Sequence, residues 1–345
     1  MENKASITIH DLAKKLNISA STVSRALNDN PRISKTTRDK IKTAALEMGY
    51  QPNTIASNLR NQKTNTIGIV VPLINRHFFS SFISGVEEVA FDRGYNVIIS
   101  QSNDLLEKEQ KIVQSLFSNR VDGLIASLSM QTDQFEHFKL FSNKHIPIVF
   151  FDRVAPELES HKIVVDDYRV GYKATEHLIE QGYKRIAHLA GPTALHTYRD
   201  RMLGYRAALE KYGFAIDDNL IIFNRLTRMD GQEAIKKLLA LPQPPDAVFC
   251  GNDTSALSML VYLKKIGVRI PQDFGLIGFS DEPFSEVVTP SISTLKQPAF
   301  DMGLKAAELL IQEIESEVKL KEHLTITVPT ELIVRESSSR IASGH

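Results

Sequence analysis

The sequence predicts an α/β protein in which a small all-α head precedes a larger core of two doubly wound parallel sheets. Two observations support this: helical periodicity within the first 50 residues, and alternating short apolar runs and amphipathic stretches from residue 66 onward. The chain has 345 residues, 42% hydrophobic and 24% charged, which is enough to bury more than one core. This composition excludes a disordered chain, a collagen-like fibre and a disulfide-rich scaffold.

The formal net charge of zero conceals a basic N-terminal region. Residues 1–62 carry ten Lys or Arg and five Asp or Glu, a net charge of +5, against −5 for the rest. The head therefore either meets polyanions or has an unevenly charged solvated surface. The single cysteine, Cys250, allows no internal disulfide or cysteine-rich metal site. We find no signal-peptide pattern or membrane-length apolar run, and expect a soluble, cytoplasmic protein.

Three short helices are predicted in the head. Thr8 and Asp11 have the spacing of a capping box, and apolar residues at i, i+3, i+4 and i+7 follow. Ser19 is expected to cap a second helix over Ala20–Leu27, and Ser34 a third helix that stops at Gly49. Two short helices joined by so brief a turn fit a helix-turn-helix, whose second helix enters the DNA major groove. A generic three-helix module is the alternative that periodicity leaves open.

The run TVSRALN, followed by GYQPNTIASNL, resembles the DNA-binding head of the lactose-repressor family of bacterial transcription regulators. The similarity continues along nearly the whole chain, and implies a double-stranded DNA operator as partner. It places base contacts at Ala20, Ser21 and Arg25, where arginine suits guanine and alanine suits a thymine methyl group. It also implies DNA-backbone contacts from short polar side chains, namely Thr8, Ser19, Thr22, Ser24, Asn28 and Thr37.

The segment PNTIASNLR, residues 52–60, is too short for a stable isolated helix, because helix nucleation is costly. The resemblance implies a hinge helix that pairs with its dimer mate in the minor groove, with Asn53, Ala56 and Leu59 as contact residues. Leu59 occupies the place of a leucine that wedges between base steps. A plain linker is the alternative. We therefore assign residues 1–50 to the helix-turn-helix domain, 51–65 to the hinge helix and linker, and 66–340 to the core.

The core alternates strand and helix, which predicts parallel sheets with right-handed crossovers. We expect helices at about 79–93, 107–119, 169–181, 200–212, 230–240, 253–266 and 299–317. Strands are expected at 66–71, 96–100, 123–126, 148–151, 163–165, 186–189, 220–223, 247–250 and 276–279, with a late strand pair at 325–328 and 331–334. We assign about 66–161 plus 291–324 to lobe 1, and about 162–290 plus 325–340 to lobe 2.

By resemblance, the core is similar to periplasmic sugar-binding proteins, in which two lobes face each other across a cleft that holds a small-molecule effector. Polar residues directly after apolar strands converge at such a cleft. The predicted effector-binding residues are Phe78, Phe79, Asp152, Asp166, Arg201, Asn252, Ser280 and Asp281. Structural alternatives stay open for several: Asp166 as a cap, Arg201 in an ion pair, and the phenylalanines as core. Asp253 is expected to be a helix N-cap.

Two departures from the family pattern concern the effector. Ser280 stands where many members have an aspartate, which Asp281 could replace, and Leu226 stands where a stacking aromatic is common. No dinucleotide fingerprint, Walker sequence, nucleophile elbow or metal-ligand spacing is present, so we predict no enzymatic activity, metal or cofactor. The predicted function is a homodimeric, sequence-specific DNA-binding regulator, a repressor controlled by a sugar or sugar derivative. The alternative is a cytoplasmic small-molecule-binding protein without DNA-binding activity.

Overall fold

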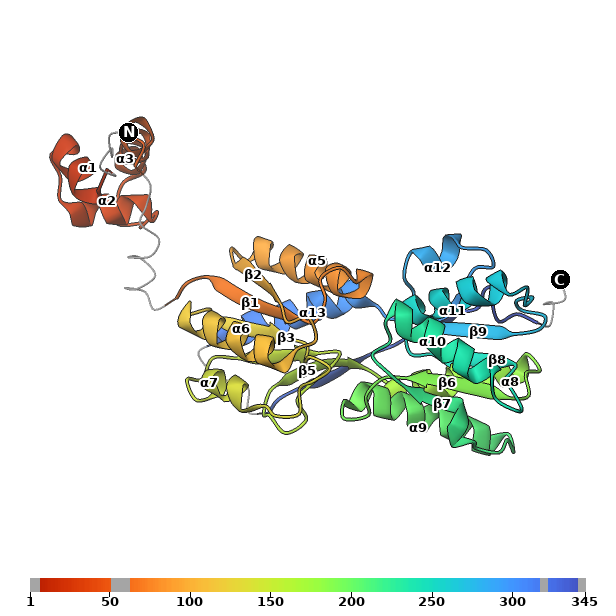
Figure 1. Ribbon diagram of the computed structural model, residues 1–345. Helices are drawn as coiled ribbons and strands as arrows, with labels where there is room; N and C mark the ends of the chain where they lie inside the picture. The colour runs from red at the N-terminus through yellow and green to blue at the C-terminus, as the bar shows by residue number, and fades with distance from the viewer. Residues whose placement is uncertain (1–6, 51–62, 317–321, 341–345) are drawn as a thin grey trace. The chain divides into compact units, whose positions relative to one another are not determined.

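The computed structural model describes residues 7–50, 63–316 and 322–340, and divides into two compact units at Thr64–Asn65 (Figure 1). The first unit contains α1 (Ile9–Leu16), α2 (Ala20–Leu27) and α3 (Lys35–Met48), as predicted. The expected caps are confirmed. Thr8 and Asp11 form a capping box, and Ser19 and Ser34 each accept a backbone N–H three residues ahead. Gly49 ends α3 with φ 66°, a backbone conformation that glycine adopts without strain.

A small apolar core holds the three helices of the head together. Leu12, Val23 and Ala26 are fully buried, and Ile41 of α3 closes the core from the third side. The backbone turns between α1 and α2 at Asn17, whose φ of 51° lies in the left-handed region that asparagine tolerates. The tight turn fixes the two helices as a helix-turn-helix.

The second unit contains two six-stranded sheets, one in each lobe (Figure 1). The sheet of lobe 1 has the strand order β11-β5-β4-β3-β1-β2, with every pairing parallel. Its strands are β1 (Thr66–Val71), β2 (Asn96–Gln101), β3 (Gly123–Ala126), β4 (Ile148–Phe151), β5 (His161–Val165) and β11 (Thr325–Val328). The central strands β3 and β4 are buried along their whole length, as expected for strands covered on both faces.

The sheet of lobe 2 has the order β12-β10-β9-β8-β6-β7, and only its edge strand β12 pairs antiparallel. Its strands are β6 (Ile186–Ala190), β7 (Ile221–Phe223), β8 (Ala247–Cys250), β9 (Gly275–Ser280), β10 (Ser293–Lys296) and β12 (Glu331–Ile333). The lone cysteine, Cys250, is buried at the end of β8, where burial raises the pKa of its thiol.

Helices cover the sheets, with α5, α6, α7 and α13 in lobe 1 and α8 to α12 in lobe 2 (Figure 1). Their bounds are α5 (His77–Asp92), α6 (Leu106–Ser118), α7 (Lys139–Ser142), α8 (Asp167–Glu180), α9 (His196–Lys211), α10 (Arg228–Leu239), α11 (Asp253–Lys265), α12 (Phe284–Val287) and α13 (Ala299–Glu315). Helices α8 and α9 meet through glycines: a Cβ on Gly171 would lie 1.9 Å from the Arg201 carbonyl oxygen. Within the described residues, no helix is long and apolar enough to cross a membrane.

The predicted lobe boundaries are wrong at three strands. Strand β5 pairs with β4 and β11, so residues 162–165 and 325–328 belong to lobe 1. Strand β10 pairs with β9, so residues 293–296 belong to lobe 2. The expected pairing between 325–328 and 331–334 does not form, because β11 and β12 join different sheets. Strand partners are chosen by contacts distant in sequence, which the local apolar pattern does not specify. The chain therefore crosses between the lobes after β5, β10 and β11.

Candidate functional site

The helix α2 presents a polar, basic surface to solvent. Ser21 and Arg25 are exposed, whereas Val23 and Ala26 on the opposite side are fully buried. The Arg25 guanidinium makes no ion pair or hydrogen bond to any residue that the structure describes. Ala20 is half-buried and packs against the apolar core of the head, so only part of its methyl group faces outward. The helix therefore offers one long cationic side chain flanked by small ones.

Most of the hydroxyls assigned to DNA-backbone contacts already make hydrogen bonds at helix N-termini. Thr8 Oγ1 donates to Asp11 at 2.7 Å, and Ser19 Oγ lies 2.8 Å from Thr22 Oγ1. Thr37 Oγ1 lies 2.8 Å from the capping Ser34. Each hydroxyl retains further hydrogen-bonding capacity, because an oxygen can both donate and accept. Asn28 closes α2 by donating to the Ser24 carbonyl at 2.9 Å, and both residues remain at the surface.

The three hinge residues Asn53, Ala56 and Leu59 lie outside the described residues, so their assignment stays a prediction.

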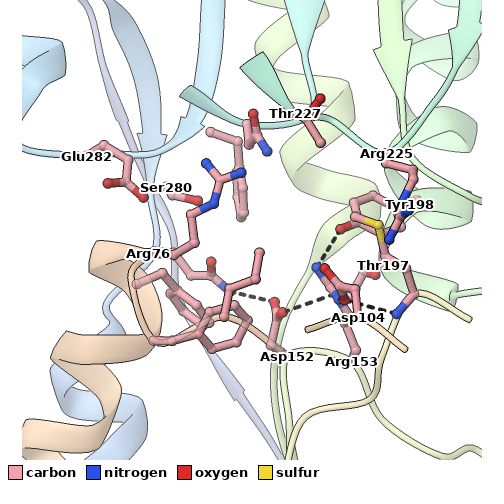
Figure 2. Close-up of a pocket in the computed structure, with 18 of the residues that line it drawn as sticks. Arg76, Asp104, Asp152, Arg153, Thr197, Tyr198, Arg225, Thr227, Ser280 and Glu282 are labelled. Carbon is pink, nitrogen blue, oxygen red and sulfur yellow. Dashed lines mark hydrogen bonds and ion pairs between the residues drawn. The ribbon is translucent and has the colours of Figure 1, made fainter. Parts of the chain in front are cut away.

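A cavity of about 320 Å³ lies between the two lobes of the core, at the carboxyl ends of their strands. Six of the predicted effector-binding residues line it: Phe78, Phe79, Asp152, Arg201, Asn252 and Ser280. Figure 2 shows Asp152 and Arg153 on one wall, with Ser280 and Glu282 on the wall across from Tyr198. Polar groups thus approach a shared space from several elements, as in a ligand site.

Asp152 is the centre of the hydrogen-bonded lobe 1 wall. Its Oδ1 accepts from Gln297 Nε2 at 3.0 Å, and Gln297 lies in the segment that crosses from β10 to α13. The neighbouring Arg153 donates to Asp104 at 2.5 Å and to the Tyr198 hydroxyl of lobe 2 at 2.9 Å (Figure 2). Burial raises the pKa of Tyr198, which keeps its hydroxyl protonated. Two of the contacts that join the lobes therefore begin at adjacent residues.

Arg201 is held from three sides in lobe 2. Its Nε donates to the buried Asp167 at 2.7 Å, and Nη1 donates to the Gly251 carbonyl at 3.2 Å. The guanidinium also lies 3.7 Å from the centre of the Phe279 ring, within cation–π distance. Arg201 therefore forms the structural ion pair with Asp167 and also lines the cavity, and its contact with an effector stays a prediction.

Several residues beside the cavity have left-handed backbone conformations. Asp152 has φ 55°, Leu226 has φ 56° and Ser280 has φ 108°. Non-glycine residues in this region store backbone strain, which concentrates at functional sites. Leu226 is nevertheless buried, and the residues on either side of it, Arg225 and Thr227, face the cavity.

Two of the predicted effector-binding residues do not line this cavity. Asp166 caps α8 by accepting from Arg169 N at 2.9 Å, and does not line the cavity between the lobes. Asp281 pairs with Arg335 at 2.8 Å and also lies outside that cavity. Both follow strands as the pattern requires, but the cap and the ion pair direct their carboxylates elsewhere.

Asn252 lines the cavity, but its side-chain amide already makes hydrogen bonds to other residues of lobe 2. Its Oδ1 accepts from Ser255 N at 2.8 Å, and Nδ2 donates to the Leu226 carbonyl at 3.0 Å. Asn252, rather than Asp253, is therefore the N-cap of α11. The buried Asp253 instead accepts from Glu282 N and Thr294 Oγ1, both at 2.8 Å, and so joins α11 to β10.

Several residues that line the cavity were not predicted from the sequence: Arg76, Asp104, Arg153, Tyr198, Arg225, Thr227, Glu282 and Gln297. Two of them had a signal in the sequence. Arg153 directly follows the predicted Asp152, and Tyr198 lies three residues before Arg201, which places both on one side of α9. The other residues come from loops and lobe crossings, whose side chains no periodic pattern describes.

The comparisons with known proteins agree with this organisation. Residues 8–53 match the family described as "Bacterial regulatory proteins, lacI family". Residues 64–335 match "Periplasmic binding proteins and sugar binding domain of LacI family". The repressor CytR of Escherichia coli strain K12 is 32% identical over 319 residues, which cover 92% of each chain.

Two further relatives span almost the whole chain. The regulator DegA of Bacillus subtilis strain 168 is 33% identical, covering 96% of this chain and 98% of its own. The solved complex of transcriptional regulator CelR with cellobiose superposes with a TM-score of 0.73 at 29% identity, covering 96% of this chain and 99% of CelR. With a helix-turn-helix head and a two-lobed core, the chain belongs to the lacI family of bacterial DNA-binding transcription regulators, and not to an enzyme family.

Proposed function

We propose that the protein is a homodimeric repressor that binds a pseudo-palindromic operator and is controlled by a small molecule in the cavity between its lobes. The observation that supports DNA binding is the capped helix α2, on which Ser21 and Arg25 are exposed. The observation that supports the control half is a polar cavity whose walls come from both lobes.

On DNA, Arg25 is assigned to read a guanine, while Ala20 and Ser21 contact neighbouring base edges. The capping hydroxyls and Asn28 are assigned to the phosphates, where they fix the register of the helix. Arg25→Gln should cost about 1–3 kcal/mol of binding at one base pair. A gel-shift series over single-base operator variants measures this. A uniform loss over all sequences would instead assign Arg25 to a phosphate.

The hinge assignment is tested separately. Leu59→Ala should weaken specific operator binding far more than non-specific binding, because an inserted leucine acts only where the duplex is kinked. Equal losses on operator and random duplex would reject the wedge. Steep weakening with rising salt is expected on both duplexes, since phosphate contacts release counterions.

Self-association is supported by an edge strand with apolar side chains. β2 ends the sheet of lobe 1, and its Ile98 and Ile99 are exposed, as are the nearby Ile74 and Leu105. An open strand edge with apolar residues favours pairing with another chain. Linking two small heads in a dimer raises the effective concentration of the second head at its half-site. Ile99→Lys should convert the dimer to monomers in sedimentation and weaken operator binding.

The control mechanism rests on contacts that cross the cavity. Arg153 of lobe 1 donates to Tyr198 of lobe 2, and Arg76 of lobe 1 donates to Thr254 of lobe 2. A ligand that bonds to these groups changes how the lobes are held, and thereby shifts the population that binds the operator. CelR was solved with cellobiose, which supports a carbohydrate or its derivative as ligand class.

Asp152→Ala tests the cavity, because it removes the acceptor of Gln297 without touching the head. We expect operator binding to persist and the response to ligand to be lost. Thermal-shift screening of sugars identifies the ligand, since binding to the native state raises the melting temperature. A fully responsive Asp152→Ala protein would contradict the cavity assignment.

A further inference from the structure

The carboxylates that face the cavity between the lobes are largely committed to protein partners. Asp104 accepts from Arg153 and from Met130 N at 3.0 Å. Asp152 accepts from Gln297. Glu282 faces Arg76, and burial raises the pKa of Glu282 although Arg76 opposes this shift. Each of these three acids therefore has a partner within the protein that offsets its negative charge or donates a hydrogen bond to it.

The arginines around the same cavity differ in whether a carboxylate neutralises their charge. Arg153 pairs with Asp104, and Arg201 pairs with Asp167. Arg76 donates to Thr254, and its charge acts on the neighbouring Glu282. Arg225 is exposed, lines the cavity, and makes no ion pair or hydrogen bond with any residue that the structure describes. Its charge is thus the one arginine charge in this wall without a described counter-charge.

The cavity also contains an unused hydroxyl. Thr197 is only 2% exposed, lines the cavity, and its Oγ1 has no hydrogen-bond partner among the described residues. A buried hydroxyl without a partner costs free energy, which a ligand can recover by bonding to it. Figure 2 shows Thr197 on the same side of the cavity as Tyr198 and Arg225.

Arg225 lies in the loop between β7 and α10, and the conformation of this loop directs it toward the cavity. Leu226 is turned into the lobe, where it packs close to Gly251, so it offers no ring or apolar surface to a ligand. Arg225 and Thr227 form the wall on either side of it. This part of the wall therefore presents a guanidinium and no ring for a sugar to stack on, and the Thr227 hydroxyl is already hydrogen-bonded to Asp230 in the capping box of α10.

We propose that the ligand of this cavity is a polyhydroxylated molecule with an acidic group, a sugar phosphate or sugar acid, whose anion is held by Arg225. The inference rests on the proposed function of the cavity and names its ligand class. The hydroxyls of the ligand bond to Thr197, Ser280 and Asp152. A charge-assisted hydrogen bond from Arg225 to the anion adds to these hydroxyl contacts, so a charged ligand binds more tightly than its neutral parent.

The test compares charged probes with their neutral parents on the full chain. Melting temperature and calorimetric affinity are measured with glucose 6-phosphate, ribose 5-phosphate and gluconate, and with glucose, ribose and inorganic phosphate. At least one charged sugar should bind about tenfold or more tightly than its neutral parent. This difference in affinity should become smaller as the salt concentration rises, because salt screens the charge. Arg225→Gln should remove about tenfold of that affinity and leave affinity for the neutral parent unchanged. Arg228→Gln, an exposed arginine outside the cavity lining, is the matched control.

Three results would overturn the inference: equal affinity for charged and neutral sugars, equal losses in Arg225→Gln and Arg228→Gln, or inorganic phosphate binding as tightly as any sugar phosphate. If neutral sugars alone bind and alter the operator gel shift, the charge assignment fails and the proposed function stands. If no charged or neutral sugar binds, the ligand assignment of the cavity fails as well, while operator binding is judged independently by the gel shift.

Discussion

The packing of α8 against α9 makes Gly171→Ala a sharp test of the core geometry. An added Cβ would lie 1.9 Å from the Arg201 carbonyl oxygen and 2.7 Å from its carbon, both backbone atoms. Restoring an ordinary contact requires the helices to separate locally by about 1.5 Å. Such overpacking costs about 1–3 kcal/mol or more, against about 1 kcal/mol gained from replacing glycine within a helix. Because the clash is with backbone atoms that cannot rotate away, we expect the upper end of that cost, about 3 kcal/mol, and therefore a net destabilisation of about 2 kcal/mol.

Urea unfolding followed by circular dichroism measures this loss, with Glu180→Ala as control. Glu180 is exposed on the same helix, so its substitution should change the free energy of unfolding by less than about 0.5 kcal/mol. Gly204→Ala should resemble Gly171→Ala, because its Cβ would lie 2.0 Å from the Tyr168 carbonyl oxygen. A Gly171→Ala protein as stable as wild type would refute the proposed steric contact.

Three further predictions concern buried charges. Arg201→Ala leaves Asp167 buried without its counter-charge and should cost about 3–5 kcal/mol in urea unfolding, part of which Asp167→Asn should restore in the double variant. Glu109→Ala should cost at least about 2 kcal/mol, because Glu109 is fully buried and accepts from Ser129 N and three side chains; a smaller loss would show that water replaces it. Burial raises the pKa of Asp253 from 3.8 to about 6, so the folded state retains a proton that the unfolded chain releases. Raising the pH from 4 to 7 should therefore lower the free energy of unfolding of wild type, relative to Asp253→Asn, by up to about 3 kcal/mol; a pH-independent difference would contradict this.

Local signals predicted most of the elements that form from local interactions. The Thr8–Asp11 capping box, the Ser19 and Ser34 caps and the stop at Gly49 depend on residues within four positions of each other, and all four are confirmed. Buried strands such as β3 and β8 were predicted with their observed bounds, because an apolar run between polar segments is itself the signal. By contrast, the polar run Ser293–Lys296 carries no such pattern, and it becomes β10 only because β9 offers it a free edge.

The residues of the cavity between the lobes also fall into a group that the sequence predicts and a group that it does not. Residues such as Asp152 and Ser280 could be predicted because the end of a parallel strand fixes their location. Asp166 and Asp281 satisfy the same pattern, but a helix cap and the distant Arg335 take their carboxylates. Asp166 is taken by a local partner three residues ahead, whereas the partner of Asp281 lies 54 residues away and has no local signal.

Alone, the sequence determined the α/β class, the helix-turn-helix, most of the strands and the family, because these follow from local periodicity and short motifs. The tertiary structure decided which strand joins which lobe, which acids are neutralised, and that Arg225 faces the cavity while Leu226 is buried. The physical reason is that pairing between distant segments depends on three-dimensional proximity, and local sequence does not encode that proximity.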